Sequence, residues 1–364
     1  MKNITEEKKS ILLFKQKSQD FIVEEQLPFN LAGKGDAFFV FFEKRNKTTM
    51  EVVEHLCKTC NISRLTLWIA GLKDKTAITR QRISIYKSAL KKIGWENFFL
   101  EKLSEVARVI KTDWHTRPLS MSDHIQNRFF IRLRATQALG EQNKQKLLDK
   151  IQSLFDKWFP NFYGIQRFGI NGNNRKTWKE IIEWKTSIRE TFEIKFKVQS
   201  YASWLFNEYV EQRLRKWLSP MDGEIVSYQD AFGIYNKKNN AIALIDNIRN
   251  TEFFYVAKTK WAEMPYQAKN MVVAAPVRWY NTMLSLWTTQ AGDFQKAFMQ
   301  KNNINPKTFA LFKTNKIYGL YRSIWTYPRE TKLRFDWDDI LLEFSLESWS
   351  YASIIVDELL EVIK

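Results

Sequence analysis

Two stretches with the pattern of β-strands enclose a short charged loop in the first quarter of the chain. Residues 65–69 form an apolar run, and residues 80–86 alternate polar with apolar side chains, which predicts strand, loop, strand. Gly71 allows the backbone to leave the first strand at an angle that other residues avoid. The loop would present Asp74 at its tip, where a rigid sheet can hold a side chain against a ligand.

Four cations lie close to Asp74 in the sequence, namely Lys73, Lys75, Arg80 and Arg82. Neighbouring positive charges favour the ionised form of a carboxyl group, so Asp74 should be negatively charged. An ionised carboxylate can act as a nucleophile that forms a covalent intermediate and later leaves. The alternative is a solvated loop in which Asp74 pairs with Lys73 or Lys75, as in most charged loops. The local pattern leaves both interpretations open.

The composition indicates a folded protein with a polyanionic partner. The 364 residues are enough for two domains, and a hydrophobic content of 45% supports a sizeable core. Lys and Arg number 57 against 40 Asp and Glu, which gives a formal net charge of +17 at pH 7. Such an excess favours nucleic acid or an anionic membrane surface as the partner. A general lysine bias of the proteome would produce the same excess without such a partner.

Membrane and metal chemistry have little support in the sequence. No apolar run reaches the ~18 residues of a membrane-spanning helix, and the first residues lack the apolar core of a signal peptide, so we expect a cytoplasmic protein. Cys57 and Cys60 supply at most two of the four ligands of a structural zinc site, and of the three histidines only His55 is close. We expect no metal site, and two half-buried cysteines on a helix.

Sequence signals before the loop predict a buried strand followed by a helix. Residues 37–42 form a continuous apolar run typical of a buried strand, and residues 43–47 form a polar break. Thr48, with Glu51 three residues later, forms a capping box that opens a helix through about Cys60.

A strand and a long helix are predicted after the loop. Residues 89–122 give mixed signals and allow no assignment, but residues 127–134 alternate apolar with basic side chains as in a strand. Apolar residues then recur at helical spacing between 147 and 159, and Pro160 should end that helix. Residues 161–169 combine aromatics, amides and Arg, which suit stacking on bases and contact with phosphate. A loop packed at the edge of a core would have the same composition.

The pattern of apolar and polar residues changes in the second half of the chain. Residues from about 175 to 320 carry long helical patterns and short, poorly defined strands, which predicts a second domain. Strand character returns at residues 335–344, and a last helix follows.

Several of these stretches, in this order, resemble motifs of the TruD family of tRNA pseudouridine synthases. The matching residues are Asp20-Phe21-Ile22-Val23-x-Glu25, Ala70-Gly71-Leu72-Lys73-Asp74-Lys75 with Ala77, Thr79 and Gln81, Asn127-x-Phe129, Asn161-Phe162-Tyr163-Gly164-x-Gln166-Arg167-Phe168-Gly169 and Ser350-Tyr351-Ala352-Ser353. Five collinear matches are far more specific than any one of them. They favour the nucleophilic interpretation of Asp74.

The resemblance implies an α+β fold with two domains. A pseudouridine synthase catalytic domain with a mixed, largely antiparallel sheet would comprise residues 1–170 and 320–364, and an inserted α/β TRUD domain would comprise residues 171–319. The implied activity is that of a tRNA pseudouridine synthase, an isomerase, with the uridine at position thirteen of the D-arm as its target. The isomerisation gains and loses no atoms, so we expect no cofactor and no metal. The expected partner is tRNA, and the expected state is a monomer.

The resemblance also implies roles for individual residues. Asp74 would attack the uracil or the ribose, or assist formation of a glycal, once the target uridine has left its stack. Tyr351 and Phe21 would hold the flipped base. Phe129 would pack beneath the site, and Asn127 would hydrogen-bond the uracil edge or Asp74. Plain core packing is the alternative for both phenylalanines. Lys15, Lys75, Arg80 and Arg167 are candidates for phosphate contact or for orienting Asp74, and Gln166 is a further substrate-binding candidate.

Three other interpretations of the sequence remain. A pseudouridine synthase acting on another RNA would keep the same chemistry. A non-catalytic RNA-binding or RNA-folding protein would lack the nucleophile, whereas Asp74 is intact. A membrane-surface protein would need a basic amphipathic helix with a wide apolar face, and no helical pattern here combines both. Departures from the family pattern, Gln126 and Trp349 in place of glycines and Asp357 in place of Arg, lie away from Asp74 in the sequence.

Overall fold

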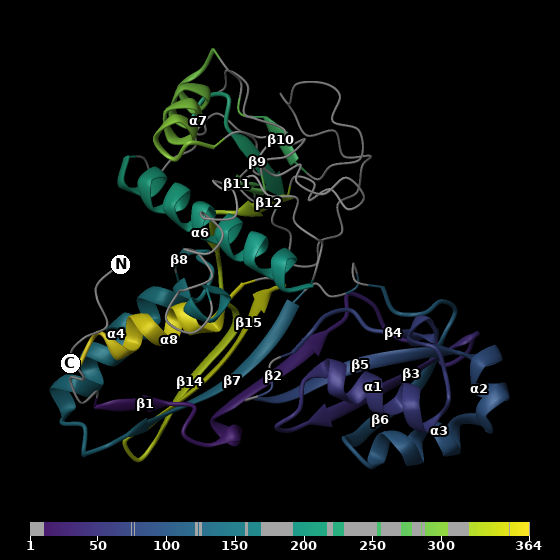
Figure 1. The fold of residues 1–364 in the computed structure, drawn as a ribbon. Coiled ribbons are helices and arrows are strands. Elements are labelled where there is room, and N and C mark those ends of the chain that lie inside the picture. The colour runs from purple at the N-terminus through teal and green to yellow at the C-terminus, as the bar shows by residue number, and fades with distance from the viewer. Residues whose placement is uncertain are drawn as a thin grey trace. The chain divides into compact units, whose positions relative to one another are not determined.

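The chain forms two compact units, each with its own sheet and helices (Figure 1). The computed structural model describes residues 11–73, 75, 77–120, 123, 126–156, 159–168, 192–216, 221–228, 253–255, 271–278, 285, 288–304, 320–348 and 350–363. The first unit comprises Met1–Lys157 and Tyr327–Lys364, and the second comprises Trp158–Thr326. The first unit thus contains both ends of the chain, and the second is continuous. The divisions lie earlier than residue 170 and later than residue 319, the boundaries expected from the sequence.

A nine-stranded mixed sheet forms the first unit, in the order β14-β15-β7-β2-β5-β3-β6, with β1 paired to β7 and β4 to β5. Its strands are β1 (Leu12–Phe14), β2 (Phe21–Gln26), β3 (Ala37–Lys44), β4 (Leu67–Trp68), β5 (Ile78–Tyr86), β6 (Arg108–His115), β7 (Gln126–Ala135), β14 (Arg329–Asp336) and β15 (Asp339–Glu347). Strands β2 and β5 are parallel, and the other described pairs of this sheet are antiparallel. The predicted α+β class with a mixed, largely antiparallel sheet is confirmed.

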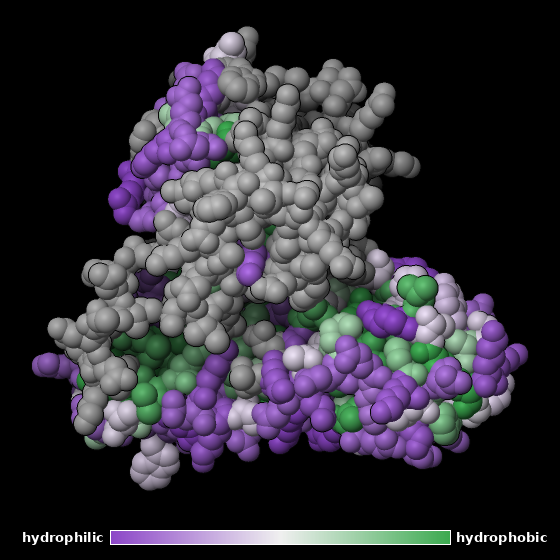
Figure 2. Space-filling view, in the orientation of Figure 1, coloured by the Kyte–Doolittle hydropathy of each residue, from purple (hydrophilic) through white to green (hydrophobic). Residues whose placement is uncertain are grey.

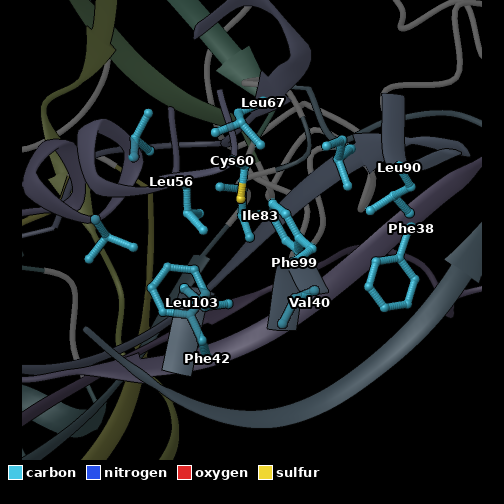
Figure 3. Close-up of a cluster of buried hydrophobic side chains, with 13 residues drawn as sticks. Phe38, Val40, Phe42, Leu56, Cys60, Leu67, Ile83, Leu90, Phe99 and Leu103 are labelled. Atoms are coloured by element: carbon cyan, nitrogen blue, oxygen red, sulfur yellow. The ribbon is translucent and has the colours of Figure 1, made fainter. Parts of the chain in front are cut away.

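Helices cover this sheet and complete its core. They are α1 (Thr49–Thr59), α2 (Lys87–Ile93), α3 (Trp95–Ser104), α4 (Glu141–Asp156) and α8 (Ala352–Leu360), with the short 3-10 helices η1 (Ser18–Asp20) and η2 (Arg64–Thr66). Figure 3 shows side chains of β3, β5, α1 and α3 meeting in one apolar cluster, which includes Phe42, Leu56 and Phe99. The predicted capping box is present: the Thr48 side chain accepts from the Glu51 N–H at 3.1 Å, and the Glu51 side chain accepts from the Thr48 N–H. Helix α1 therefore begins where the sequence indicated.

Two local predictions were wrong in detail. Phe159 was expected on the long helix, but α4 ends at Asp156 and Phe159 belongs to β8 (Phe159–Pro160), because its burial comes from pairing with β13 (Trp325–Thr326) in the second unit. The polar break was expected to start at Glu43, but β3 continues through Lys44, and both side chains are buried.

Residues 89–122, which the sequence left unassigned, contain much of α2 and all of α3 and β6. Gly94 separates the two helices with a φ of +95°.

The second unit combines helices with a four-stranded antiparallel sheet in the order β10-β9-β11-β12. Its elements are η4 (Ile165–Phe168), α6 (Phe192–Lys216), β9 (Ile225–Tyr228), β10 (Phe253–Tyr255), β11 (Met271–Arg278), α7 (Gln290–Lys301) and β12 (Leu320–Ser323), besides β8 and β13. A bidentate ion pair lies inside it: Arg213 Nε and Nη2 donate to the two Glu224 carboxylate oxygens at 2.6 and 2.8 Å, with both side chains buried. Paired in this way, the two charges can be buried.

Candidate active site

The two predicted strands around the loop are present as β4 and β5, which pair so that Trp68 lies opposite Ser84. The first strand is shorter than the predicted residues 65–69, because Arg64–Thr66 form η2 and only Leu67–Trp68 form β4. The loop that joins the two strands contains Asp74, which itself lies outside the described residues. Its neighbours differ sharply in environment, since Lys73 is buried and Lys75 is exposed. The described side chains thus change from buried at Lys73 to exposed at Lys75.

Buried side chains hold both backbone groups of Lys73, the residue before Asp74. The Lys73 N–H donates to Thr49 Oγ1 at 2.9 Å, and that hydroxyl donates in turn to Gln81 Oε1 at 2.9 Å. The carbonyl of Lys73 accepts from Lys44 Nζ at 3.4 Å. Thr49, Gln81 and Lys44 are at most 1% exposed. Because they come from α1, β5 and β3, three elements of the packed core hold the backbone of Lys73 in place.

The side chain of Lys73 turns inward to a polar pair on β2 and β7. Its Nζ donates to Asn127 Oδ1, and the strand register places Asn127 opposite Glu25. Glu25 accepts from the Arg82 N–H at 3.1 Å through Oε1, and its Oε2 has no hydrogen-bond partner in the described part of the chain. Burial raises the pKa of Glu25, against the opposing charges of Lys73 and Arg82. A buried carboxyl, a buried ammonium and an amide thus lie together beside the loop.

The predicted phenylalanines lie in the core rather than at an open surface. The rings of Phe21 and Phe129 stack at 6.1 Å with an interplanar angle of 18°, and they are 6% and 5% exposed. Phe129 also contacts Phe344 at 5.6 Å. The ammonium of Lys15 lies 4.3 Å from the centroid of the Phe21 ring. The structure therefore brings Lys15, which follows β1, to Phe21 and Phe129, which lie on the two strands that also carry Glu25 and Asn127.

The other predicted residues of the first unit have different environments. Lys75 pairs with Glu51 at 3.2 Å and is 56% exposed at its side chain. Arg80 is held between Glu24 at 3.1 Å and Glu43 at 3.0 Å, so its charge is already matched by two carboxylates. Tyr351 is half-buried and precedes the first residue of α8.

Gln166 and Arg167 belong to η4 of the second unit. Arg167 Nη2 donates to Gln199 Oε1 at 3.2 Å, and its Nε donates to Ser203 Oγ at 3.3 Å. The guanidinium carbon lies 5.8 Å from the centroid of the Tyr163 ring. The side chain of Gln166 lies outside the described residues. Arg167 is thus tied to α6.

Sequence reasoning missed the positions that hold the loop. Glu25 and Gln81 fall inside matched motifs, so a signal for them existed, and Lys73 adjoins Asp74. Thr49 and Lys44 gave no such signal, because only the folded sheet brings them to the loop. In the part of the chain that the structure describes, no cluster of three or more His, Cys, Asp or Glu side chains could hold a metal ion. None of the helices in that part is long and apolar enough to cross a membrane.

Replacing Glu25 by glutamine should make unfolding less dependent on pH. The folded-state pKa of Glu25 is raised above its ordinary value of 4.5, so the folded state holds this proton more tightly than the unfolded state does. The wild type should therefore lose stability as the pH rises from 4.5 through the folded-state pKa. The variant keeps the acceptor for the Arg82 N–H without that titration.

The check is urea unfolding of both proteins at a series of pH values from 4 to 8. The stability of Glu25→Gln relative to wild type should increase across this series. The exposed Glu141→Gln serves as the control and should follow the wild type. A relative stability that is constant or falls with pH would contradict the prediction.

Comparison with known proteins gives one consistent picture. A family model described as tRNA pseudouridine synthase D (TruD) matches residues 3–192 and 194–359. The tRNA pseudouridine synthase D of Aliivibrio salmonicida (strain LFI1238) is 27% identical over 361 residues, which is 96% of this chain and 92% of that protein. That of a Nitratiruptor species is 32% identical over 204 residues, 55% of this chain and 53% of its own.

The fold also matches that of a solved structure. The crystal structure of a tRNA pseudouridine synthase D (TruD) from Methanosarcina mazei matches with a TM-score of 0.61 and 18% identity. The match covers 96% of this chain and 93% of that one. At this identity the likeness supports the fold alone.

Proposed function

Because the chain belongs to the TruD family of tRNA pseudouridine synthases, isomerases that act on RNA, we propose that it converts the uridine at position thirteen of a tRNA D-arm to pseudouridine, with Asp74 as nucleophile. The reaction breaks the bond from ribose C1′ to uracil N1, turns the base and joins C1′ to C5. A carboxylate suits it, because the same group can attack and later leave. The substrate is tRNA, and the enzyme acts as a cytoplasmic monomer.

The observation that carries this proposal is the fixed path of the chain into residue 74. A nucleophile must be held in a near-attack geometry, and a misplacement of about 1 Å can cost on the order of 100-fold in rate. The Lys73 backbone provides such a restraint, because its N–H donates to Thr49 Oγ1 and its carbonyl accepts from Lys44 Nζ. The motif around Asp74 is thus anchored on rigid elements, as a catalytic site requires.

The remaining site residues receive complementary roles in this proposal. The target uridine leaves its stack, and Tyr351 holds the flipped base. Phe21 is buried, with Phe129 stacked on its ring and the Lys15 ammonium over it, so its role is to pack beside the site. Lys73 donates to Asn127 Oδ1 and so orients the Asn127 amide toward the uracil edge. Phe129 stacks on the Phe21 ring and holds it in place. Lys15 sits over the Phe21 ring, where its ammonium can meet a phosphate.

Two candidates for phosphate contact, Arg80 and Lys75, differ in their exposure and in the number of carboxylates with which they pair. Arg80 is less exposed and lies between two carboxylates, so it fixes the strand end rather than binding phosphate. Lys75 pairs with one carboxylate, Glu51, but its side chain is 56% exposed, so it can exchange that partner for the RNA backbone. The second unit would be the inserted TRUD domain, with Gln166 and Arg167 among its contributions to RNA affinity.

The experiment that tests this function is an assay on an unmodified tRNA transcript. After incubation with the wild type, pseudouridine is mapped by site, and tRNA binding is measured in parallel. We expect one pseudouridine, at position thirteen of the D-arm, and none in a transcript with cytidine there. Product at another uridine would overturn the assigned target. A folded wild type that binds tRNA without forming product would favour the non-catalytic alternative.

A further inference from the structure

A groove at one end of the first unit is lined by aromatic, apolar and cationic side chains. Its volume is about 660 Å³, and its walls come from the end of α1, from η2 and β4, and from α2 with the start of α3. Trp68, Tyr86 and Leu65 line it and are 40%, 39% and 84% exposed. Apolar surface is visible at this end of the unit in Figure 2, around the place that β4 and α2 occupy in Figure 1. Exposed aromatic side chains gathered in one groove indicate a binding surface.

Trp68 and Tyr86 form a corner suited to a flat ligand. Their ring centroids are 6.3 Å apart and the planes meet at 90°. A planar group that stacks on one ring therefore presents its edge to the other, which is a favourable aromatic arrangement in both contacts. The pairing of β4 with β5 sets this geometry on the backbone of the sheet.

The charges around the groove match a polyanion. Its lining residues include Lys92 and no Asp or Glu. Helix α2 carries Lys87, Lys91 and Lys92 without an acidic residue. None of the three pairs with a carboxylate within the described residues, while Lys91 and Lys87 lie over the rings of Trp95 and Trp114 at 5.5 and 5.6 Å. Aromatic faces beside uncompensated lysines are the combination that binds unpaired nucleotides.

The groove and the nucleophile share one hairpin. Trp68 precedes Asp74 by six residues, and an extended chain of that length spans about 20 Å at most. An RNA with its target uridine at Asp74 therefore has other nucleotides near the groove. We propose that this groove binds an unpaired nucleotide of the RNA substrate, stacked on Trp68 and Tyr86 with its phosphate toward Lys92. The inference rests on the RNA substrate of the proposed function.

The test compares tRNA affinity and rate in three single variants. Trp68→Ala should raise the Kd for the tRNA transcript on the order of 10-fold, because stacking on an aromatic ring is lost. Lys92→Glu should weaken binding and reduce the slope of log Kd against log salt by about one ion. The single-turnover rate at saturating enzyme should stay at the wild-type value, since neither side chain touches the reacting atoms. Trp337→Ala is the matched control, because Trp337 is 91% exposed and lies outside the groove.

A second readout keeps the result independent of folding and of catalysis. Photo-crosslinking of wild type to the transcript should yield a crosslinked peptide containing Trp68 or Tyr86. Unchanged affinity in both groove variants, with no such peptide, would overturn the inference and leave the proposed function standing. A wild type that crosslinks there but forms no pseudouridine would support the groove and refute the reaction.

Discussion

Replacing Asp74 by asparagine should abolish pseudouridine formation while tRNA affinity stays within about twofold of wild type. The amide keeps the size and polarity of the side chain but cannot attack and then leave as a carboxylate does. Loss of a nucleophile costs rate on the order of 10³-fold or more. The measurement is a single-turnover time course with enzyme in excess, together with binding at equilibrium.

Asp149→Asn supplies the matched control for this substitution. Asp149 is exposed on α4 and accepts only from the Gln145 side chain four residues earlier among its described hydrogen bonds. It should turn over at the wild-type rate. Turnover by Asp74→Asn above a few per cent of wild type, with its mass confirmed, would assign the nucleophile to another residue.

Replacing Thr49 by valine should lower the single-turnover rate on the order of 100-fold at saturating enzyme, with little change in Kd. Valine has the same shape, but it removes the hydroxyl that joins the Lys73 N–H to Gln81. The backbone before Asp74 then loses a restraint, and small errors in the position of a reacting group are costly. A buried N–H left without its acceptor also favours a shifted loop.

Two companions make the Thr49 result specific. Thr49→Ser restores the hydroxyl and should recover most of the rate, which a purely structural role for the methyl group would not predict. Thr136→Val removes a hydroxyl bond to the Ile11 carbonyl elsewhere in the first unit and should leave the rate unchanged. A wild-type rate in Thr49→Val would show that the loop is held by other contacts.

Local signals account for what the sequence could predict of the fold. The capping box at Thr48 and the alternation of residues 80–86 depend on neighbouring residues only, and both elements are present. Residues 89–122 could not be assigned from the sequence, because the two helices that Gly94 separates are too short to show a helical period. The prediction that Phe159 lies on the long helix was wrong because this side chain is buried on a strand, β8. The spacing of apolar residues does not show which element buries an apolar side chain.

The same difference between local and long-range information applies to the candidate site residues. Asp74, Asn127 and Phe21 could be proposed as site residues because each lies in a motif that is continuous in the sequence. Lys44 looked like part of a polar break, yet it is fully buried and donates to the Lys73 carbonyl, which directly precedes Asp74. That role exists only once β3 lies beside β5. No pattern within one segment carries such information.

The interrupted sheet of the first unit has a consequence for how the protein is made. Strand β15 pairs with β7 along its whole length, although the entire second unit lies between them in the chain. A ribosome adding ~5–20 residues per second reaches β15 roughly 10–40 s after β7. Until then one edge of β7 exposes unpaired N–H and C=O groups, which can recruit strands from other chains. The second unit is synthesised before that edge closes, so the sheet of the first unit can be completed only after the whole second unit has been made.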